Sequence, residues 1–238
     1  MKNKTILGLT MAFVMGALVV TPLFAQYISD IPIDSTNTSK VISKILIEDM
    51  IRYQNMPEIN KTGKDGLTPL MRAITAGDLA QVNILLEDKD IDIDIESDSG
   101  NTALCWAIFY CKKDIVEILA EHGANLNKNC FYFDQYLRQQ YDTPLVTAYE
   151  FAYNSPKYDD YKEIVTTLIK HNANLNIINY GKSALTCAIY DNDLNMVQMM
   201  VEHGADPNKP INHNGDTALT KAYNRPDIVK FFEDYNKN

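Results

Sequence analysis

The chain has 238 residues, of which 46% are hydrophobic and 22% are charged. That composition is sufficient for a packed core and excludes an intrinsically disordered protein. The formal net charge of −9 at pH 7 disfavours binding to nucleic acid and to anionic lipid, because both are themselves negatively charged.

Residues 1–25 are predicted to be a secretory signal peptide. Two lysines precede an uncharged, mostly apolar run over residues 6–20, and Ala25 supplies a small residue before a cut at Gln26. The alternative is an uncleaved membrane anchor, which is disfavoured because the run is shorter than the ~20 residues of a spanning helix. We therefore expect a periplasmic or secreted protein that has no membrane attachment after cleavage.

Residues 26–61 are predicted to form an N-terminal capping segment. The apolar residues between Thr38 and Asn55 are spaced so that they form one stripe along a helix. The stretch that follows, up to Asn60, resembles the tail of a degenerate repeat. A cap of this kind would cover the exposed end of a stack of repeats.

One six-residue motif, which begins with Thr or Ser and ends with Ala, occurs five times at intervals of 34, 41, 40 and 34 residues. The copies are Thr68–Ala73, Thr102–Ala107, Thr143–Ala148, Ser183–Ala188 and Thr217–Ala222. A second apolar run follows each copy. We expect the hydroxyl residue to cap a first helix, and Gly123, Gly204 or Asn172 to end a second helix in a left-handed conformation.

This pattern resembles the ankyrin repeat, whose signature begins Thr-Pro-Leu. The resemblance covers about residues 56–235 and implies an all-α solenoid of helix-turn-helix plus hairpin units. One unit cannot bury its own apolar face, so neighbouring units stack into a continuous core. We expect about five repeats over residues 62–238, preceded by an N-terminal capping helix and closed by a shortened fifth repeat.

Two insertions account for the longer intervals. Residues 128–141 enlarge the hairpin between repeats two and three, and residues 153–161 are expected to lengthen the turn between the two helices of repeat three. The first insertion is rich in aromatic residues. It is either a binding loop or a small satellite core in which the rings fold back on the stack.

The four cysteines are Cys105, Cys111, Cys130 and Cys187. Their spacing does not indicate a disulfide framework, and buried free thiols are the favoured interpretation. A bridge between Cys105 and Cys130 is the alternative, because the base of the hairpin lies near the start of the first helix.

In ankyrin-like proteins the contact surface is formed by the hairpin tips and the exposed end of each first helix. Those positions are aromatic in the middle repeats and polar at both ends, which is typical of a protein-binding patch. Alternatively, the rings shield the seams between repeats. The predicted partner-binding residues are Phe109, Tyr110, Tyr141, Phe151, Tyr180, Tyr190 and Asp191.

No catalytic or metal-binding constellation stands out, and no cofactor is expected. His122, His171 and His203 occupy the same place in three copies, which indicates a structural role. Alternating carboxylates over residues 90–98 could collect calcium, but the run lacks the glycine and terminal glutamate of a calcium loop. An acidic hairpin face is the preferred interpretation.

The sequence thus predicts an exported, non-catalytic and monomeric module that binds a protein partner, which the acidic surface would allow to be basic. The alternative is an immunity-type inhibitor of a secreted toxin, and an enzyme is the third and least favoured class. The composition, rich in Asn, Lys, Ile and Tyr, favours a bacterial source.

Overall fold

The computed structural model describes residues 51–134, 136–153 and 155–235. The predicted signal peptide and most of the predicted capping helix lie outside the described residues. Residues 51–55 are helical, and a short 3-10 helix, η1 (Glu58–Asn60), follows them.

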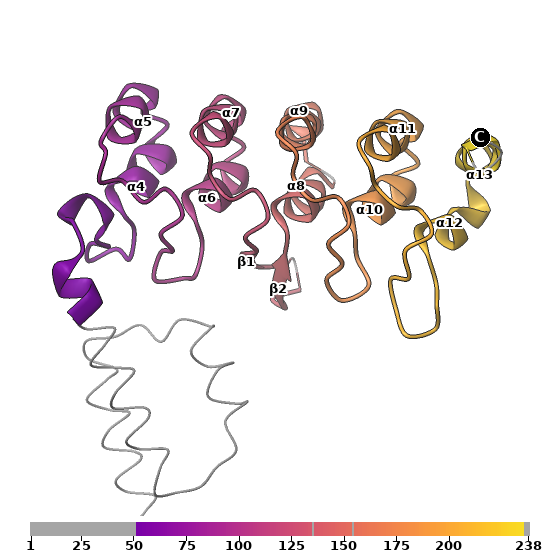
Figure 1. Ribbon diagram of the computed structural model, residues 1–238, viewed down its shortest axis with the longest axis horizontal. Helices are drawn as coiled ribbons and strands as arrows, with labels where there is room; N and C mark the ends of the chain where they lie inside the picture. Colours follow the sequence, from indigo (N-terminus) through magenta and orange to yellow (C-terminus); the bar gives the residue numbers. More distant parts are fainter. Residues whose placement is uncertain (1–50, 135, 154, 236–238) are drawn as a thin grey trace, which may run out of the picture.

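The described residues contain five pairs of helices, which stack side by side in two rows (Figure 1). The first helices of the pairs pack on one another along the whole row, and the second helices form the outer row. The pairs are α4 (Pro69–Ala76) and α5 (Leu79–Leu86), α6 (Ala103–Phe109) and α7 (Lys113–Glu121), α8 (Pro144–Ala152) and α9 (Tyr158–Lys170), α10 (Ala184–Tyr190) and α11 (Leu194–Glu202), and α12 (Ala218–Lys221) and α13 (Pro226–Tyr235), with the 3-10 helix η2 (Ala222–Asn224) inside the last pair.

The repeated hydroxyl residues cap the first helices as predicted. In each copy the Thr or Ser side chain accepts a hydrogen bond from the backbone N–H three residues later, for instance from Met71 to Thr68 at 3.3 Å. Beyond the second helices, Gly123 (φ 79°), Gly204 (φ 93°) and Asn172 (φ 64°) are left-handed. These predicted helix boundaries are confirmed.

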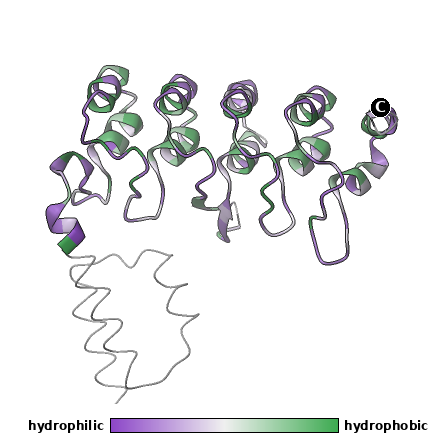
Figure 2. Cartoon of the chain, viewed as in Figure 1, coloured by the Kyte–Doolittle hydropathy of each residue, from purple (hydrophilic) through white to green (hydrophobic). Residues whose placement is uncertain are grey.

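The core lies between the two rows of helices. The leucine at the third position of the repeated motif is buried in the first four copies, where Leu70, Leu104, Leu145 and Leu185 are at most 2% exposed. Figure 2 shows that the helices carry both hydrophobic and hydrophilic residues, which suits elements that bury only one side. Because every repeat contributes the same apolar positions, the core is continuous along the stack.

Besides the shared core, a series of hydrogen bonds joins the loops of neighbouring repeats. In each loop one Asn or Asp side chain accepts a hydrogen bond from a backbone N–H of the next repeat, and we call this series the loop ladder. Its members are Asp92 to Asn60 (2.8 Å), Asn125 to Asp94 (2.9 Å), Asn174 to Asn127 (2.7 Å) and Asp206 to Asn176 (2.8 Å), each written as N–H donor to side-chain acceptor.

The first insertion forms a two-stranded antiparallel hairpin, β1 (Cys130–Phe133) with β2 (Gln139–Asp142), in which Cys130 pairs with Asp142 and Phe133 with Gln139. The base of this hairpin differs from the prediction of free cysteines. Cys105 and Cys130 are joined by a disulfide and are not the buried thiols that the spacing favoured, because the hairpin returns Cys130 to the start of α6. Cys111 and Cys187 are free.

The second insertion also differs from its prediction. Only residues 153–157 connect the two helices of repeat three, whereas residues 158–161 form the first turn of α9. The reason is packing, because Tyr161 within that turn is buried (5% exposed) and this burial favours extending the helix. In the part of the chain that the structure describes, no helix is both long and apolar enough to cross a bilayer.

Candidate functional site

The aromatic hairpin is fixed firmly to repeat two. Besides the disulfide at its base, the Asn101 side chain accepts from the Phe131 N–H (2.7 Å) and donates to the Phe131 carbonyl (2.9 Å). A covalent bond and a paired hydrogen bond therefore hold the start of β1 against the loop that precedes α6.

From this anchored strand, Tyr132 reaches back to the first helices. Its ring lies 6.2 Å from that of Phe109 and 5.3 Å from that of Phe151, and Phe109 and Phe151 stack at 5.2 Å, measured between centroids. We name this group, with its neighbours, the aromatic cluster. Its members are Trp106, Phe109, Tyr110, Tyr132, Phe151 and Tyr161.

The other aromatic rings of residues 128–141 lie outside the aromatic cluster. Phe131 and Tyr141 pair across the hairpin at 4.2 Å and are half-buried. Phe133 and Tyr136 are each 69% exposed. The insertion therefore contains both a folded-back ring, as a satellite core would have, and free rings, as a binding loop would have.

The seven predicted partner-binding residues do not form one uniform patch. Phe109 and Phe151 are half-buried inside the aromatic cluster, and Tyr110 stacks on Trp106 while remaining 47% exposed. Tyr141 lies in the hairpin. The other three, Tyr180, Tyr190 and Asp191, belong to repeat four and its preceding loop, and both of these tyrosines are exposed.

Tyr180 occupies the tip of the loop before α10. Asn179 and Lys182 pair as an isolated antiparallel bridge, and Tyr180 (φ 49°) and Gly181 (φ 81°) both adopt left-handed backbone between them. Two left-handed central residues are what a type I′ turn requires. This turn leaves the Tyr180 side chain 89% exposed.

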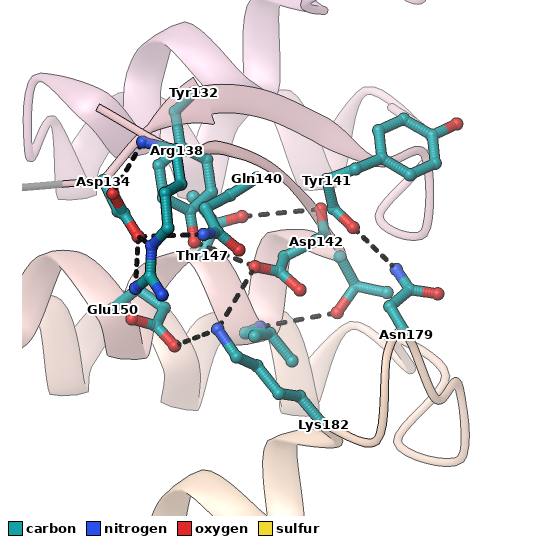
Figure 3. Close-up of polar contacts among 12 residues, drawn as sticks. Tyr132, Asp134, Arg138, Gln140, Tyr141, Asp142, Thr147, Glu150, Asn179 and Lys182 are labelled. Carbon is teal, nitrogen blue, oxygen red and sulfur yellow. Dashed lines mark hydrogen bonds and ion pairs between the residues drawn. The ribbon is translucent and has the colours of Figure 1, made fainter. Parts of the chain in front are cut away.

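A polar cluster of Asp142, Glu150 and Lys182 adjoins the aromatic cluster through Tyr132 (Figure 3). Asp142, which is 2% exposed, accepts a hydrogen bond from the Tyr132 hydroxyl at 2.9 Å. Lys182 Nζ lies 3.8 Å from the same carboxylate and 2.6 Å from Glu150 Oε1. The cluster thus ties the hairpin, α8 and the loop before α10 together.

The electrostatics of this polar cluster follow from its burial. Burial raises the pKa of the Asp142 carboxyl, although Lys182 and the Tyr132 hydroxyl act in the opposite direction. Asp142 and Lys182 each stand directly before the Thr or Ser of a repeat, so the repeat spacing alone places them on this face. Their mutual pairing could not be predicted, since it depends on the path of the inserted hairpin.

The three histidines that share one place in the repeats have structural surroundings. His122 Nδ1 and His203 Nδ1 each lie 2.8 Å from the carbonyl oxygen four residues earlier, and His171 Nε2 lies 2.9 Å from Glu117 Oε1. Over residues 51–134, 136–153 and 155–235, no group of three His, Cys, Asp or Glu side chains could hold a metal ion. In the acidic run, the Asp94 carboxylate is a member of the loop ladder.

A comparison with protein families matches three segments, residues 37–130, 138–211 and 155–238, to the family model of ankyrin repeats. Together they span most of the chain and carry the helix pairs and loops described above. The chain is an ankyrin-repeat protein. Proteins built of ankyrin repeats generally serve as protein-interaction modules.

Two relatives of this ankyrin-repeat protein illustrate how widely the repeat occurs. The potassium channel AKT2/3 of Arabidopsis thaliana is 24% identical over 198 residues, which are 76% of this chain and 25% of the channel. The ankyrin repeat protein nuc-2 of Neurospora crassa is 29% identical over 154 residues, which are 63% of this chain and 13% of that protein. The chain therefore spans a quarter or less of these relatives.

Among solved structures, the ankyrin stack is similar to a chain in the complex of the predatory endopeptidase Bd0816 from Bdellovibrio bacteriovorus with the immunity protein Bd3460. The TM-score is 0.52 at 24% identity, and the match covers 76% of this chain and 86% of that one. At this identity the likeness shows the fold.

Proposed function

We propose that this ankyrin-repeat protein is an exported, non-catalytic adaptor that binds a protein partner through the face formed by its first helices and hairpins. The observation that carries the proposal is the exposure of three tyrosines on the middle repeats. Tyr110, Tyr180 and Tyr190 are 47%, 89% and 57% exposed, beside a packed aromatic cluster. Tyrosine is enriched among the residues that dominate binding energy at protein interfaces.

Two further observations support the remaining parts of the proposal. The Cys105–Cys130 disulfide favours export, because structural disulfides persist mainly in oxidising compartments. A non-catalytic role is supported by His122, His171 and His203, each of which has a ring nitrogen in contact with a backbone carbonyl or with Glu117.

An immunity-type inhibitor of a secreted toxin is the second candidate. It is favoured by one observation, namely that a chain with this fold occurs in a complex of an endopeptidase with an immunity protein. The acidic net charge of −9 would also suit a basic enzyme as target.

The test is affinity capture from an envelope extract of the source organism, with wild-type protein and a Tyr110→Ala/Tyr190→Ala variant. We expect a partner that the variant retains at least about tenfold more weakly, because aromatic hot spots contribute ~2 kcal/mol or more each. Ile84→Ala is the matched control, because Ile84 is 62% exposed on α5 in the outer row.

The outcomes separate the candidates. Equal capture by wild type and the double variant, with both proteins melting alike, would overturn the proposed face. A captured enzyme whose activity the protein blocks would identify an inhibitor, whereas a captured protein that keeps its activity would identify an adaptor.

A further inference from the structure

Four of the five described loops that precede a first helix share one backbone feature. Each has a glycine two residues before the capping Thr or Ser, and this glycine is left-handed in every case: Gly66 (φ 72°), Gly100 (φ 79°), Gly181 (φ 81°) and Gly215 (φ 77°). The residue before the glycine is exposed in all four loops. In chain order it is Asp65, Ser99, Tyr180 and Asn214. Only the last of these loops therefore carries a side-chain amide at this place.

The Asn214 side chain is exposed, and its amide makes no hydrogen bond within the described part of the chain. Its neighbour Asn212 holds the loop instead. The Asn212 side chain accepts from the backbone N–H groups of Asn214 (3.0 Å) and Asp216 (3.1 Å) and donates to the Asp216 carboxylate (2.8 Å). In the first loop the matching Asp65 carboxylate is bound by Arg72 at 2.8 Å. The side-chain amide of Asn214 is therefore free to turn toward the backbone.

Gly215 leaves its own backbone nitrogen accessible. A glycine has no Cβ to hinder approach, and apart from the two adjacent residues no described atom lies within 4 Å of where a Cβ of Gly215 would be. The Gly215 N–H donates to the Asn212 carbonyl at 3.2 Å, at the long end of the range for such bonds. The equivalent bonds of Gly66 and Gly100 are 2.9 and 2.8 Å long. Asn214 and Gly215 also form the only Asn-Gly pair in the sequence.

We propose that Asn214 is a site of spontaneous deamidation in the folded protein. The Gly215 backbone nitrogen, after losing its proton to hydroxide, attacks the side-chain carbonyl carbon of Asn214. A new C–N bond forms, the bond to the side-chain nitrogen breaks, and that nitrogen leaves as ammonia with a proton from water. A water molecule then opens the succinimide ring at either carbonyl, which gives aspartate or isoaspartate at position 214. The net reaction consumes one water and releases one ammonia, and it needs no oxidant or reductant.

Both products change the loop before α12. Each adds a negative charge two residues from Asp216, whose carboxylate is already paired with Lys221 at 2.6 Å. Isoaspartate also adds one carbon atom to the main chain and so lengthens the turn between Asn212 and Asp216. In that product we expect two bonds to weaken, the Asp216 N–H to Asn212 Oδ1 (3.1 Å) and the Ile211 N–H to the Asp216 carbonyl (2.7 Å). Hydrogen exchange at these two amides measures the change.

The test incubates the whole folded protein at neutral and mildly alkaline pH, well below its unfolding temperature. Peptide mapping by mass spectrometry locates the converted residue, and electron-transfer fragmentation distinguishes isoaspartate from aspartate. We expect conversion at Asn214 with release of an equal amount of ammonia, while the other asparagines keep their amides. The rate should rise about tenfold per pH unit, because the deprotonated fraction of a weak acid does so below its pKa.

Two variants and a peptide locate the cause. Asn214→Ser is the matched control, because Ser99 occupies the same place in repeat two, and it should keep a single charge form throughout. Tyr180→Asn places an asparagine before the left-handed Gly181 at an exposed loop tip and should gain a second site of conversion. A synthetic peptide of residues 208–220 gives the rate without the fold. The folded protein should convert at most about tenfold more slowly, which corresponds to breaking one typical hydrogen bond at Gly215.

Three results would overturn the inference. The first is an Asn214 amide that stays intact in the folded protein while the peptide converts. The second is conversion of other asparagines as fast as Asn214, with circular dichroism showing that the protein is still folded. The third is the absence of conversion at residue 180 in Tyr180→Asn, which would show that the loop position does not confer reactivity. Neither the reaction nor its readout involves a partner, so the inference stands or falls independently of the proposed function.

Discussion

Cys105 in the first turn of α6 is bonded to Cys130 at the start of β1, and their Cα atoms lie 5.5 Å apart. The bond spans 25 residues of sequence, which include all of α7. It holds the base of the inserted hairpin against the helix that carries Phe109 and Tyr110. The aromatic face is thus built on a covalently fixed strand and not on a loose loop.

We expect Cys105→Ser/Cys130→Ser to lose about 3 kcal/mol of unfolding free energy, because the bond restricts the unfolded chain over a loop of this length. Urea denaturation of the two proteins measures the difference, and Cys111→Ser, which removes a free thiol, should cost much less. Alkylation without reductant should label two cysteines per chain. Labelling of all four in protein from an oxidising host would contradict the bond.

The loop ladder should contribute measurably to stability. Asn127→Ala removes the acceptor of the Asn174 N–H and should destabilise by about 0.5–1.5 kcal/mol, the net contribution of a typical hydrogen bond, because water can reach this exposed donor. Asn195→Ala, at an exposed position of α11, should change the unfolding free energy far less. If both substitutions have the same small effect in chemical denaturation, the ladder does not carry stability.

Tyr180→Asn should stabilise the protein. A bulky residue in left-handed backbone costs about 1–2 kcal/mol, whereas Asn-Gly is the preferred pair for a type I′ turn, and Tyr180 buries little of its ring in return. We expect a gain of about 1 kcal/mol, read as a rise in melting temperature. Tyr223→Asn, at a position 75% exposed without left-handed backbone, should bring no such gain.

Asp191→Asn should stabilise the free protein at neutral pH. The folded-state pKa of Asp191 is raised above its unfolded value, so its favourable contribution is present below the unfolded pKa and is lost as the pH rises through the folded pKa. The amide removes this loss, and the gain should be under about 1 kcal/mol, because water screens the half-buried group. Denaturation curves of the two proteins should converge below pH ~4. A destabilising effect at pH 7 would show that the carboxylate has a favourable partner.

The repeats were predictable because their signals are local. A Thr or Ser places a cap within three residues of itself, and Asn172 takes the left-handed position that Gly123 and Gly204 take in other copies. The disulfide was not predictable in the same way. Whether Cys130 reaches Cys105 depends on how the inserted chain turns back, and no residue near either cysteine determines that path.

The aromatic residues show the same limit at the candidate site. Composition indicated that the rings of residues 128–141 would gather, but not which would be buried. Side chains alternate across a strand, so Tyr132 packs on Phe109 and Phe151 while its neighbour Phe133 remains exposed. The partnership of Asp142, Tyr132 and Lys182 follows from that same register.

The loop ladder also bears on how such a chain can change its length. Each joint requires only one side-chain oxygen in one repeat and one backbone N–H in the next, and the donors Asn174 and Asp206 occupy equivalent places. A protein lacking residues 174–205 would therefore present the Asp206 N–H to Asn127 in the same way. The ladder would thus survive the loss or duplication of repeat four, whereas the loss of repeat four would leave the buried Asp142 carboxylate without Lys182.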